Sequence, residues 1–343
     1  MQTTLRGLAL AGTLAIAAIP AEAQQTFYVA GYGGSFEQTI RKEVLPAFQQ
    51  RHNLRIEYVA GNSTDTLAKL QAQRGNQQID VAFMDDGPMF MGIQLGFCAP
   101  ITGLPEADIV PAARFPGDRA VGVGIVGTGL MYSIDYFKEK GWAPPTSWND
   151  LTDPKFRKLI VIPPINNTYG LHTLVMFARM AGGGERQIEP GFAAMKDKVN
   201  PNVLVYEPSP GKMTELFQSG QAVLGVWGTG RVASFAATGF NVGFVYPKEG
   251  TPTLLAAICP IAKQNPSPIA QEFVRAMVAP ELQALLAREY GYGPVNRHAP
   301  VDPTAMPMAP VGERAQQLIN VDWDVINQNR DAWTRRWNRE VER

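Results

Sequence analysis

Short apolar runs alternate with amphipathic segments along this chain, and the junctions between them carry glycine, serine, asparagine or aspartate. Residues 26–30 (TFYVA) form such a run, closed by Gly31, and through residues 36–50 an aromatic or aliphatic side chain recurs every four positions. A short apolar run bounded by glycine is typical of a strand, and an apolar residue every third or fourth position is typical of an amphipathic helix. Strand, turn and helix in this order predict an α/β fold.

The same pattern continues at once. Residues 54–59 (LRIEYV) alternate as a second strand, Ser63 or Thr64 can cap the helix that follows, and residues 79–84 (IDVAFM) read as a third strand. Because strand–helix–strand units with short connections pair in parallel, these segments predict a βαβαβ lobe.

The middle of the chain changes character. Residues 120–132 (AVGVGIVGTGLMY) are apolar and too rich in glycine for a helix, so we expect extended chain passing from one lobe to another. A second α/β lobe is predicted from helices at 147–151 and 169–181 and strands at 159–162 and 223–227, and a return crossing at 253–261 precedes helices at 268–277 and 280–289.

The length of 343 residues also favours two domains. Residues 300–310 are a proline-rich connector, and the Trp-bearing tail from Gly312 suggests a helix packed on one lobe. We expect lobe 1 to comprise residues 24–126 and 251–298, and lobe 2 to comprise residues 127–250 and 299–343.

Residues 1–23 have the pattern of an export signal. Arg6 precedes an apolar run at 8–19, and Pro20 leads to the small-residue site Ala21-Glu22-Ala23. The run is about twelve residues, whereas a helix that crosses a bilayer needs roughly twenty, so we expect a signal peptide cleaved near Ala23 rather than a retained anchor. The mature chain is then predicted to work in the periplasm.

The charge balance argues against polyanionic partners. The chain has 31 Lys and Arg against 31 Asp and Glu, so no net field attracts nucleic acid or an anionic membrane. A small-molecule partner is the better expectation. The two cysteines, Cys98 and Cys259, would lie in an oxidising compartment and match no metal motif, which leaves two alternatives, a disulfide or two buried thiols.

Motifs of catalysis are missing from the sequence. The three histidines lie far apart, and there is no Gly-x-Ser-x-Gly elbow, phosphate-binding P-loop or paired-histidine helix. Gly122-Val-Gly124-Ile-Val-Gly127 matches the dinucleotide fingerprint in letters, but its flanks are strand-like and it lies in mid-chain. We therefore expect no catalytic residue, no metal and no cofactor, and a protein that is not an enzyme.

Polar and aromatic residues do gather at the predicted strand-to-helix turns. In α/β folds these turns meet at the carboxyl ends of the strands, where helix N-termini point free N–H groups at ligands. Plain helix capping would explain any single one of these residues equally well. The candidate ligand-binding residues are Tyr32, Ser35, Ser63, Asp85, Asp86, Asn167, Thr168, Tyr169, Trp227, Thr229, Arg231 and Tyr292.

Several segments together resemble one family. They are Tyr28 to Gly34, Val126 to Tyr132 (VGTGLMY), Pro145 to Phe156 (PTSWNDLTDPKF), Gly225 to Trp227, Tyr246 to Gly250 (YPKEG) and Gly291 to Asn296 (GYGPVN). The chain resembles the periplasmic solute-binding proteins of ABC importers, in particular the group of spermidine/putrescine receptors with their iron and thiamine relatives. The resemblance implies a monomeric two-lobe clamp, joined by crossing strands, that closes on a small-molecule solute and delivers it to an ABC permease in the inner membrane.

The ligand is where the sequence departs from that group. Polyamine receptors place a Trp and an Asp just after the Pro-Lys-Glu-Gly stretch, whereas this chain has Leu254 to Ala257 there, so a polyamine would lose its charge partners. Iron relatives use clustered tyrosines with an acid and a His, whereas Tyr290 and Tyr292 stand apart in the sequence without these partners. We expect neither ligand.

Arg231 points to a different ligand. It follows Gly228-Thr229-Gly230 at the start of a predicted helix, where a guanidinium could grip a carboxylate or phosphonate; it could also be paired across the lobes. If Asp85 or Asp86 faced it, the pocket would suit a solute with both an amine and an acid. We expect a carboxylate or amino-acid-like solute, and the alternatives are a polyamine receptor, a ligand sensor that docks on a receptor, and an exported hydrolase.

Overall fold

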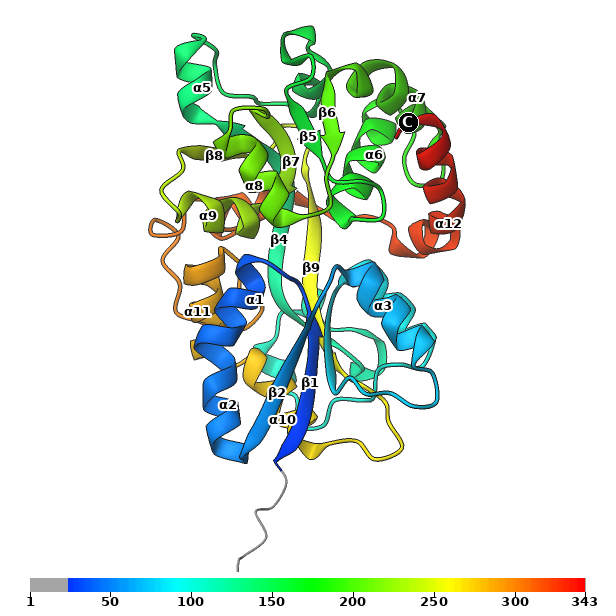
Figure 1. Cartoon of the computed structure of the whole chain (residues 1–343), viewed down its shortest axis with the longest axis vertical. Helices are drawn as coiled ribbons and strands as arrows, with labels where there is room; N and C mark the ends of the chain where they lie inside the picture. The colour runs from blue at the N-terminus through cyan, green and yellow to red at the C-terminus, as the bar shows by residue number, and fades with distance from the viewer. Residues whose placement is uncertain (1–23, 343) are drawn as a thin grey trace, which may run out of the picture.

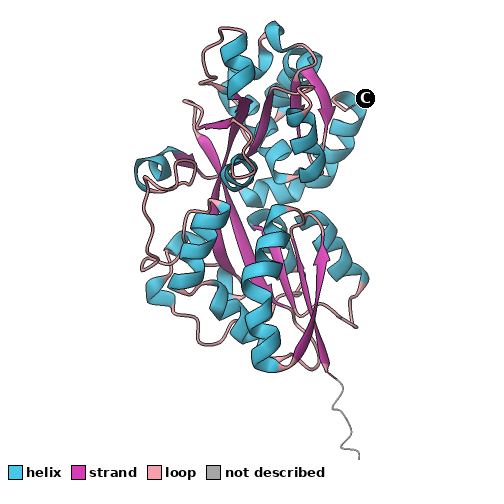
Figure 2. Cartoon of the chain, turned by 60° about the vertical axis from the view of Figure 1, so that its left-hand side comes forward, coloured by secondary structure: helices cyan, strands magenta, loops and turns pink. Residues whose placement is uncertain are grey.

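The structure, a computed structural model, describes residues 24–342 of the chain and shows two lobes, one above the other in Figure 1. The expected signal peptide, residues 1–23, lies outside the described residues. We call the half that holds β1 to β3 lobe 1 and the half that holds β5 to β8 lobe 2. Figure 2 shows helices packed around the strands in each half.

Lobe 1 begins as the alternation of strands and helices predicts. Strand β1 pairs in parallel with β2 on one side and with β3 on the other, which confirms the parallel βαβαβ unit. The first helical run is continuous but has a π-helical turn at Ile40–Val44. The elements are β1 Gln25–Gly31, α1 Ser35–Thr39, α2 Leu45–His52, β2 Leu54–Ala60, α3 Ser63–Ala72, β3 Val81–Asp85, α4 Asp86–Gln94, α10 Pro268–Met277 and α11 Pro280–Tyr290.

Two long antiparallel strands, β4 Val121–Ser133 and β9 Thr251–Pro260, run between the lobes as expected. The first part of β4 pairs with β9, and from Thr128 onwards β4 pairs with β7 instead. One sheet path therefore passes through both lobes, in the order β2-β1-β3-β9-β4-β7-β5-β6. A short third strand, β10 Leu318–Ile319, pairs in parallel with β9 near the crossing.

Lobe 2 repeats the α/β plan on the far side of the crossing. Its elements are α5 Ile134–Glu139, β5 Ile160–Ile162, α6 Thr168–Met180, α7 Glu189–Ala194, β6 Val203–Tyr206, α8 Pro210–Gln218, β7 Leu224–Gly228, α9 Thr229–Ala236, β8 Val242–Val245 and α12 Trp323–Glu340. The predicted helix at 147–151 is a 3-10 turn at Trp148–Thr152, closed by a capping box between Ser147 and Asp150. Within the described residues, no helix combines the length and apolarity that crossing a membrane requires.

Further short helical turns occupy the connections. They are the 3-10 turns Glu106–Asp108, Pro111–Ala113, Pro116–Asp118, Pro154–Phe156, Asn200–Asn202 and Gly312–Gln317, and the π-helical turn Met195–Val199.

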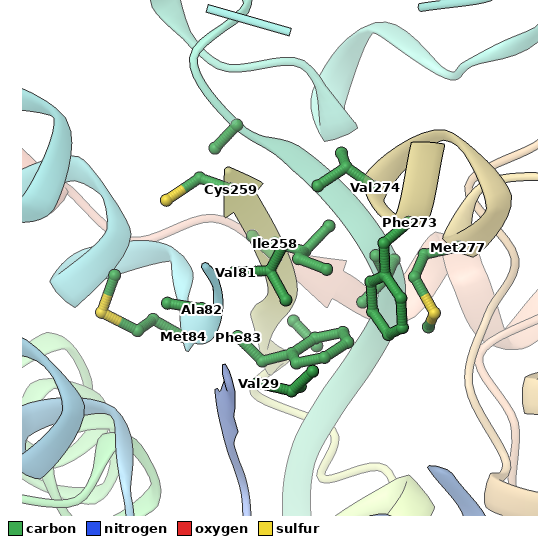
Figure 3. Packing of buried hydrophobic residues seen from close by; sticks show 14 of the residues in the cluster. Val29, Val81, Ala82, Phe83, Met84, Ile258, Cys259, Phe273, Val274 and Met277 are labelled. Carbon is green, nitrogen blue, oxygen red and sulfur yellow. The ribbon is translucent and has the colours of Figure 1, made fainter. Parts of the chain in front are cut away.

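Each lobe has its own buried core. In lobe 1 the strand side chains meet α10, and Phe83 and Phe273 point toward one another with ring centroids 6.4 Å apart (Figure 3). In lobe 2 the fully buried Trp148 and Trp337 belong to a separate cluster, and Trp337 lies on α12. The tail thus forms the expected helix against one lobe, whereas Val311, earlier in the tail, packs with Ala287 of α11 in lobe 1.

The two cysteines form a disulfide, which settles the alternative that the sequence leaves open. Cys98 follows α4 and Cys259 lies in β9 beside Ala82 of β3, with their Cα atoms 5.6 Å apart. Both belong to lobe 1. The bridge closes a loop across 161 positions of sequence and ties the end of the crossing strand β9 to the segment that follows α4.

We expect the double variant Cys98→Ala, Cys259→Ala to lose about 2–5 kcal/mol of unfolding free energy, because a cross-link over a long loop restricts the unfolded chain. Denaturant unfolding followed by circular dichroism measures the loss. Reductant should shift the wild type in the same direction and leave the variant unchanged. An unfolding midpoint equal to that of the oxidised wild type would show that the bridge contributes nothing.

Candidate functional site

A cavity of about 510 Å³ lies where the turns of the two lobes face each other. Strands β1, β2 and β3 of lobe 1 end at it, and so do β5, β6 and β7 of lobe 2, because β5 is parallel to both of its neighbours. The carboxyl ends of parallel strands thereby meet across the crossing, the usual ligand position in α/β sheets.

Eight of the candidate residues line this cavity. They are Tyr32, Ser63, Asp85, Asn167, Thr168, Tyr169, Arg231 and Tyr292. They come from the turns that follow β1, β2, β3 and β5, from the start of α9 and from the segment after α11. Residues remote in the sequence are thus brought to one place by the meeting of two sheets.

Four candidates do not line the cavity. Ser35 begins α1, with its hydroxyl 3.5 Å from Nη1 of Arg231. Trp227 packs into the interior cluster that contains Met131, and Thr229 is buried with its hydroxyl accepting the N–H of Gly127. These placements correct the expectation for Trp227 and Thr229, because their side chains serve the packing between β4, β7 and α9.

Asp86 is the fourth. Asp85 is the last residue of β3 and Asp86 the first of α4, and only Asp85 lines the cavity. The carboxyl of Asp86 is buried instead beside Trp323 of α12. Of the two acids that the sequence offers, Asp85 is thus the one that lines the cavity together with Arg231, and its side chain does not cap α4.

Sequence reasoning missed several lining residues. The largest omission is the turn at 208–211, which follows β6 and opens α8. Its signal is present, since the apolar run 203–206 (VLVY) precedes Pro208-Ser209-Pro210-Gly211 in the same strand–turn–helix order as elsewhere. The other omitted lining residues are Gly33, Gly34, Glu37, Ala60, Gly61, Asn62, Asp65, Asn166, Leu254 and Tyr290.

Arg231 brings a buried positive charge to the cavity. Only 9% of it is exposed, and its Nη1 donates to the carbonyl of Gly33 across the lobes at 2.9 Å. Its guanidinium lies 5.7 Å from the centroid of the Tyr290 ring. Among the described residues no carboxylate lies within ion-pair distance of it. A buried charge held by neutral groups alone is costly, so an anionic group in the cavity would be favoured there.

Asp85 is the acidic counterpart in lobe 1. Its carboxylate accepts a hydrogen bond from the hydroxyl of Thr168 in lobe 2, and its N–H donates to Ser63 at 2.9 Å. Burial raises the pKa of Asp85 above its ordinary value, and the hydrogen bond from Thr168 opposes that shift. The carboxylate would be stabilised further by a cationic group in the cavity.

The other two lining acids already have partners. Glu37 accepts from Nε of Arg41 at 2.8 Å, one turn along the same helical run. Asp65 forms the capping box of α3 with Asn62. Asp85 and Arg231 are therefore the charged groups best placed to act on a solute.

Four tyrosines surround these two charges: Tyr32, Tyr169, Tyr290 and Tyr292. From the sequence, Tyr290 and Tyr292 are not expected to belong to a tyrosine cluster. In the structure their ring centroids lie 4.7 Å from each other. Burial raises the pKa of all four phenols, so they remain neutral hydroxyls. In the described part of the chain, no group of three or more His, Cys, Asp or Glu side chains is arranged to hold a metal ion.

Helix N-termini add to the positive character of the site. Helices α3, α6 and α8 begin at the cavity, and the side chains of Asn62, Asn167 and Ser209 cap them. Capping and lining thus coincide at Asn62, Asn167 and Ser209. Because each N-terminus carries a partial positive charge and N–H groups without helical partners, the three ends favour an anion between them.

Residues 43–310 match the family model described as bacterial extracellular solute-binding protein. The chain belongs to this family. The match confirms the sequence resemblance to solute-binding proteins of ABC importers, and it identifies an exported binding protein rather than an enzyme.

Other members of the fold resemble the chain over most of its length. An uncharacterized protein of Haemophilus influenzae is 25% identical over 308 residues, which cover 86% of this chain and 85% of that one. The periplasmic binding protein AfuA of Actinobacillus pleuropneumoniae superposes with a TM-score of 0.77 at 21% identity, covering 93% and 99% of the two chains. AgtB of A. tumefaciens R10 gives 0.74 at 21%, covering 94% and 100%.

We expect Gly124→Ala to weaken solute binding by about tenfold or more, through overpacking that costs about 1–3 kcal/mol. A Cβ at Gly124 would lie 2.0 Å from the ring of Tyr292, which must then move from its place in the cavity wall. Gly243→Ala is the control, since a Cβ there would lie 2.4 Å from the ring of Tyr132, a comparable clash with a tyrosine that does not line the cavity. Calorimetric titration compares the two, and equal affinities would contradict a fixed role for Tyr292.

Proposed function

We propose that this protein is the periplasmic substrate-binding component of an ABC transporter, and that it captures a small organic carboxylate or amino-acid-like solute. The proposal rests above all on Arg231, a buried cation at the cavity with no carboxylate partner among the described residues. Asp85 lies in the same cavity on the opposite lobe. An acid group would bind Arg231 and the helix N-termini, and an amine would bind Asp85.

Relatives of the same fold support an acidic solute. AfuA is known with fructose-6-phosphate bound and AgtB in complex with agropinic acid, compounds that carry a phosphate and a carboxylic acid. Another similar structure, at 19% identity, is the Atu4243–GABA receptor. At these identities the likeness concerns the fold, and the choice of ligand class depends on the charges in this cavity.

A polyamine fits this cavity less well. Its ammonium groups would meet Arg231, and the aliphatic Leu254 lines the wall where polyamine receptors carry charge partners. Glu37 and Asp65 are already engaged in lobe 1. A sensor that docks on a receptor would use the same cavity, so transport in vesicles reconstituted with a permease is the measurement that separates importer from sensor.

We further propose that binding closes the two lobes, with residues 24–126 and 251–298 moving against residues 127–250 and 299–343. The hinge would lie where β4 exchanges β9 for β7 as its partner, between Gly127 and Thr128. Two contacts across the cavity, Arg231 to Gly33 and Thr168 to Asp85, belong to the closed arrangement. A solute that bridges both lobes stabilises this state.

Thermal denaturation of the purified protein against carboxylates, amino acids, sugar phosphates, polyamines and metal ions tests the ligand class. We expect an acidic or zwitterionic solute to raise the melting temperature by several degrees, because only the folded clamp binds it. Calorimetry on that solute should show Arg231→Ala binding about 10- to 150-fold more weakly, the worth of a charge-assisted hydrogen bond of about 1.5–3 kcal/mol.

The control variant is Arg55→Ala, which removes an exposed arginine paired with Glu57 at 2.6 Å in lobe 1. Its affinity should equal that of the wild type. A response to spermidine or putrescine alone would overturn the ligand class, and an unchanged affinity in Arg231→Ala would overturn the proposed anion site.

A further inference from the structure

The turn between β3 and α4 touches lobe 2 on two sides. Asp85 faces the cavity and its carboxylate accepts a hydrogen bond from the hydroxyl of Thr168, whereas the buried carboxyl of its neighbour Asp86 lies beside the indole of Trp323 at the start of α12. Two consecutive residues of lobe 1 thus contact lobe 2 in front of the turn and behind it.

The contact behind the turn is close. A Cβ at Gly87 would lie 2.4 Å from the ring of Trp323, so only glycine allows the indole to rest on the start of α4. The amide of Asn327, one turn further along α12, donates to the carbonyl of Gly87 at 3.2 Å. We call these contacts of Asp86 and Gly87 with Trp323 and Asn327 the rear contact.

Helix α12 is anchored in lobe 2 by its other side. Ile326, Trp333 and Trp337 are buried in the lobe 2 core, and Arg330 donates to the carbonyl of Asn166 at 3.2 Å. The helix therefore has to move with lobe 2. A rotation of lobe 2 about an axis that does not pass through the rear contact would therefore also change the distance between Trp323 and Gly87.

We propose that the rear contact is a second closing contact between the lobes, and that Asp86 takes up a proton when it forms. The proposal rests on the lobe closure proposed above. In this proposal helix α12, which lies outside the cavity, helps to set the fraction of molecules in the closed state.

The surroundings of Asp86 favour its protonated form in the closed state. Its side chain is 7% exposed, and no described cation lies within ion-pair distance of it. Burial and the adjacent Asp85 raise the pKa of Asp86 to about 8, although the N–H of Gly87 donates to the carboxylate and the nearby Trp323 and Leu255 also oppose the shift.

The charged neighbours come from each packed element. Asp85 faces Asp86 from β3, and Arg330 is the cation from α12 that acts on both acids. Helix α3 brings the hydroxyl of Ser63 to the N–H of Asp85, and the backbone of Leu255 reaches Asp86 from β9. His172 of α6, whose ring lies 5.8 Å from that of Trp323, stays neutral because burial lowers its pKa to about 3.

The direction of the pH effect follows. When the lobes separate, water reaches Asp86 and its pKa returns toward the ordinary value of 3.8. A pKa higher in the closed state means that closing binds a proton between about pH 4 and pH 8, so closure is favoured at low pH and weakens as pH rises through this range. One proton corresponds to about a tenfold change per pH unit.

Distances between the lobes test the proposal without any solute. Spin labels on cysteines placed at the exposed Gln71 of α3 and Gln218 of α8 report the separation of the lobes. We expect the closed population to fall between pH 5.5 and pH 7.5 in the wild type, and to fall less steeply in Asp86→Asn, where Asp85 is the acid of this turn that still titrates. The amide keeps an acceptor for the indole but cannot ionise. The exposed acid Asp324 gives the matched control, because Asp324→Asn should keep the wild-type response.

The affinity for a solute found in the thermal screen gives the second readout. In a plot of the logarithm of this affinity against pH, the slope should be smaller by up to one unit in Asp86→Asn than in the wild type. The remaining slope comes from Asp85, which titrates in the same direction. Trp323→Phe removes both the indole N–H and the part of the ring that meets Gly87, and should weaken binding several-fold at pH 6 with unchanged circular dichroism.

The outcomes separate the two proposals. An Asp86→Asn protein with the same pH response as the wild type, or a wild type whose lobe separation ignores pH, overturns the rear contact as a proton-linked device. Absence of binding by any acidic solute overturns the proposed ligand class, while the spin-label result still decides the rear contact.

Discussion

The pairing of β4 with β9 is the constraint on which the rest of the structure depends. These two strands carry one sheet path through both lobes, and β4 changes partner from β9 to β7 in the middle of its length. Because each half-sheet extends from this crossing, the carboxyl ends of the strands in lobe 1 face those in lobe 2. The cavity is therefore a product of topology, and the side chains around it only determine what it binds.

The chemistry of the cavity follows from a division of charge between the lobes. Lobe 2 supplies a buried guanidinium and two helix N-termini, and lobe 1 supplies one carboxylate with a raised pKa. Within residues 24–342, neither Arg231 nor Asp85 has an ion-pair partner in its own lobe. Desolvating such groups is costly when they stay unpaired, so a solute that supplies the complementary charges gains affinity and draws the lobes together in one event.

The elements of the fold could be predicted because they are encoded locally. Periodicity and glycine-bounded runs located β1 to β3, the crossings and most helices, and the turn residues Asn167 and Thr168 were found at the ends of predicted strands. The short strand β6 was missed, and with it the turn at 208–211, because four residues between helical segments give a weak periodic signal. Whether Cys98 and Cys259 were bridged also required the tertiary structure.

What could not be predicted is the direction in which neighbouring side chains point. Asp85 and Asp86 are equivalent in the sequence, yet the change from strand to helix between them sends one to the cavity and the other to α12. Trp227 and Thr229 are residue types that are common in ligand-binding sites, but their side chains are buried in the interior of the protein. Tyr290 and Tyr292 belong to a group of four tyrosines only because the fold brings Tyr32 and Tyr169 from other turns to the same cavity.

The two contacts of the β3–α4 turn give closure a common mechanical origin. A solute acts on the turn through Asp85, and α12 acts on it through Asp86 and Gly87, one and two residues further along. Both contacts join the same short segment to lobe 2, so in the proposed closure a rotation that breaks one would strain the other. Free energy from the helix would then be added to that from the solute, and the affinity measured for a ligand would include a contribution from residues that never touch it.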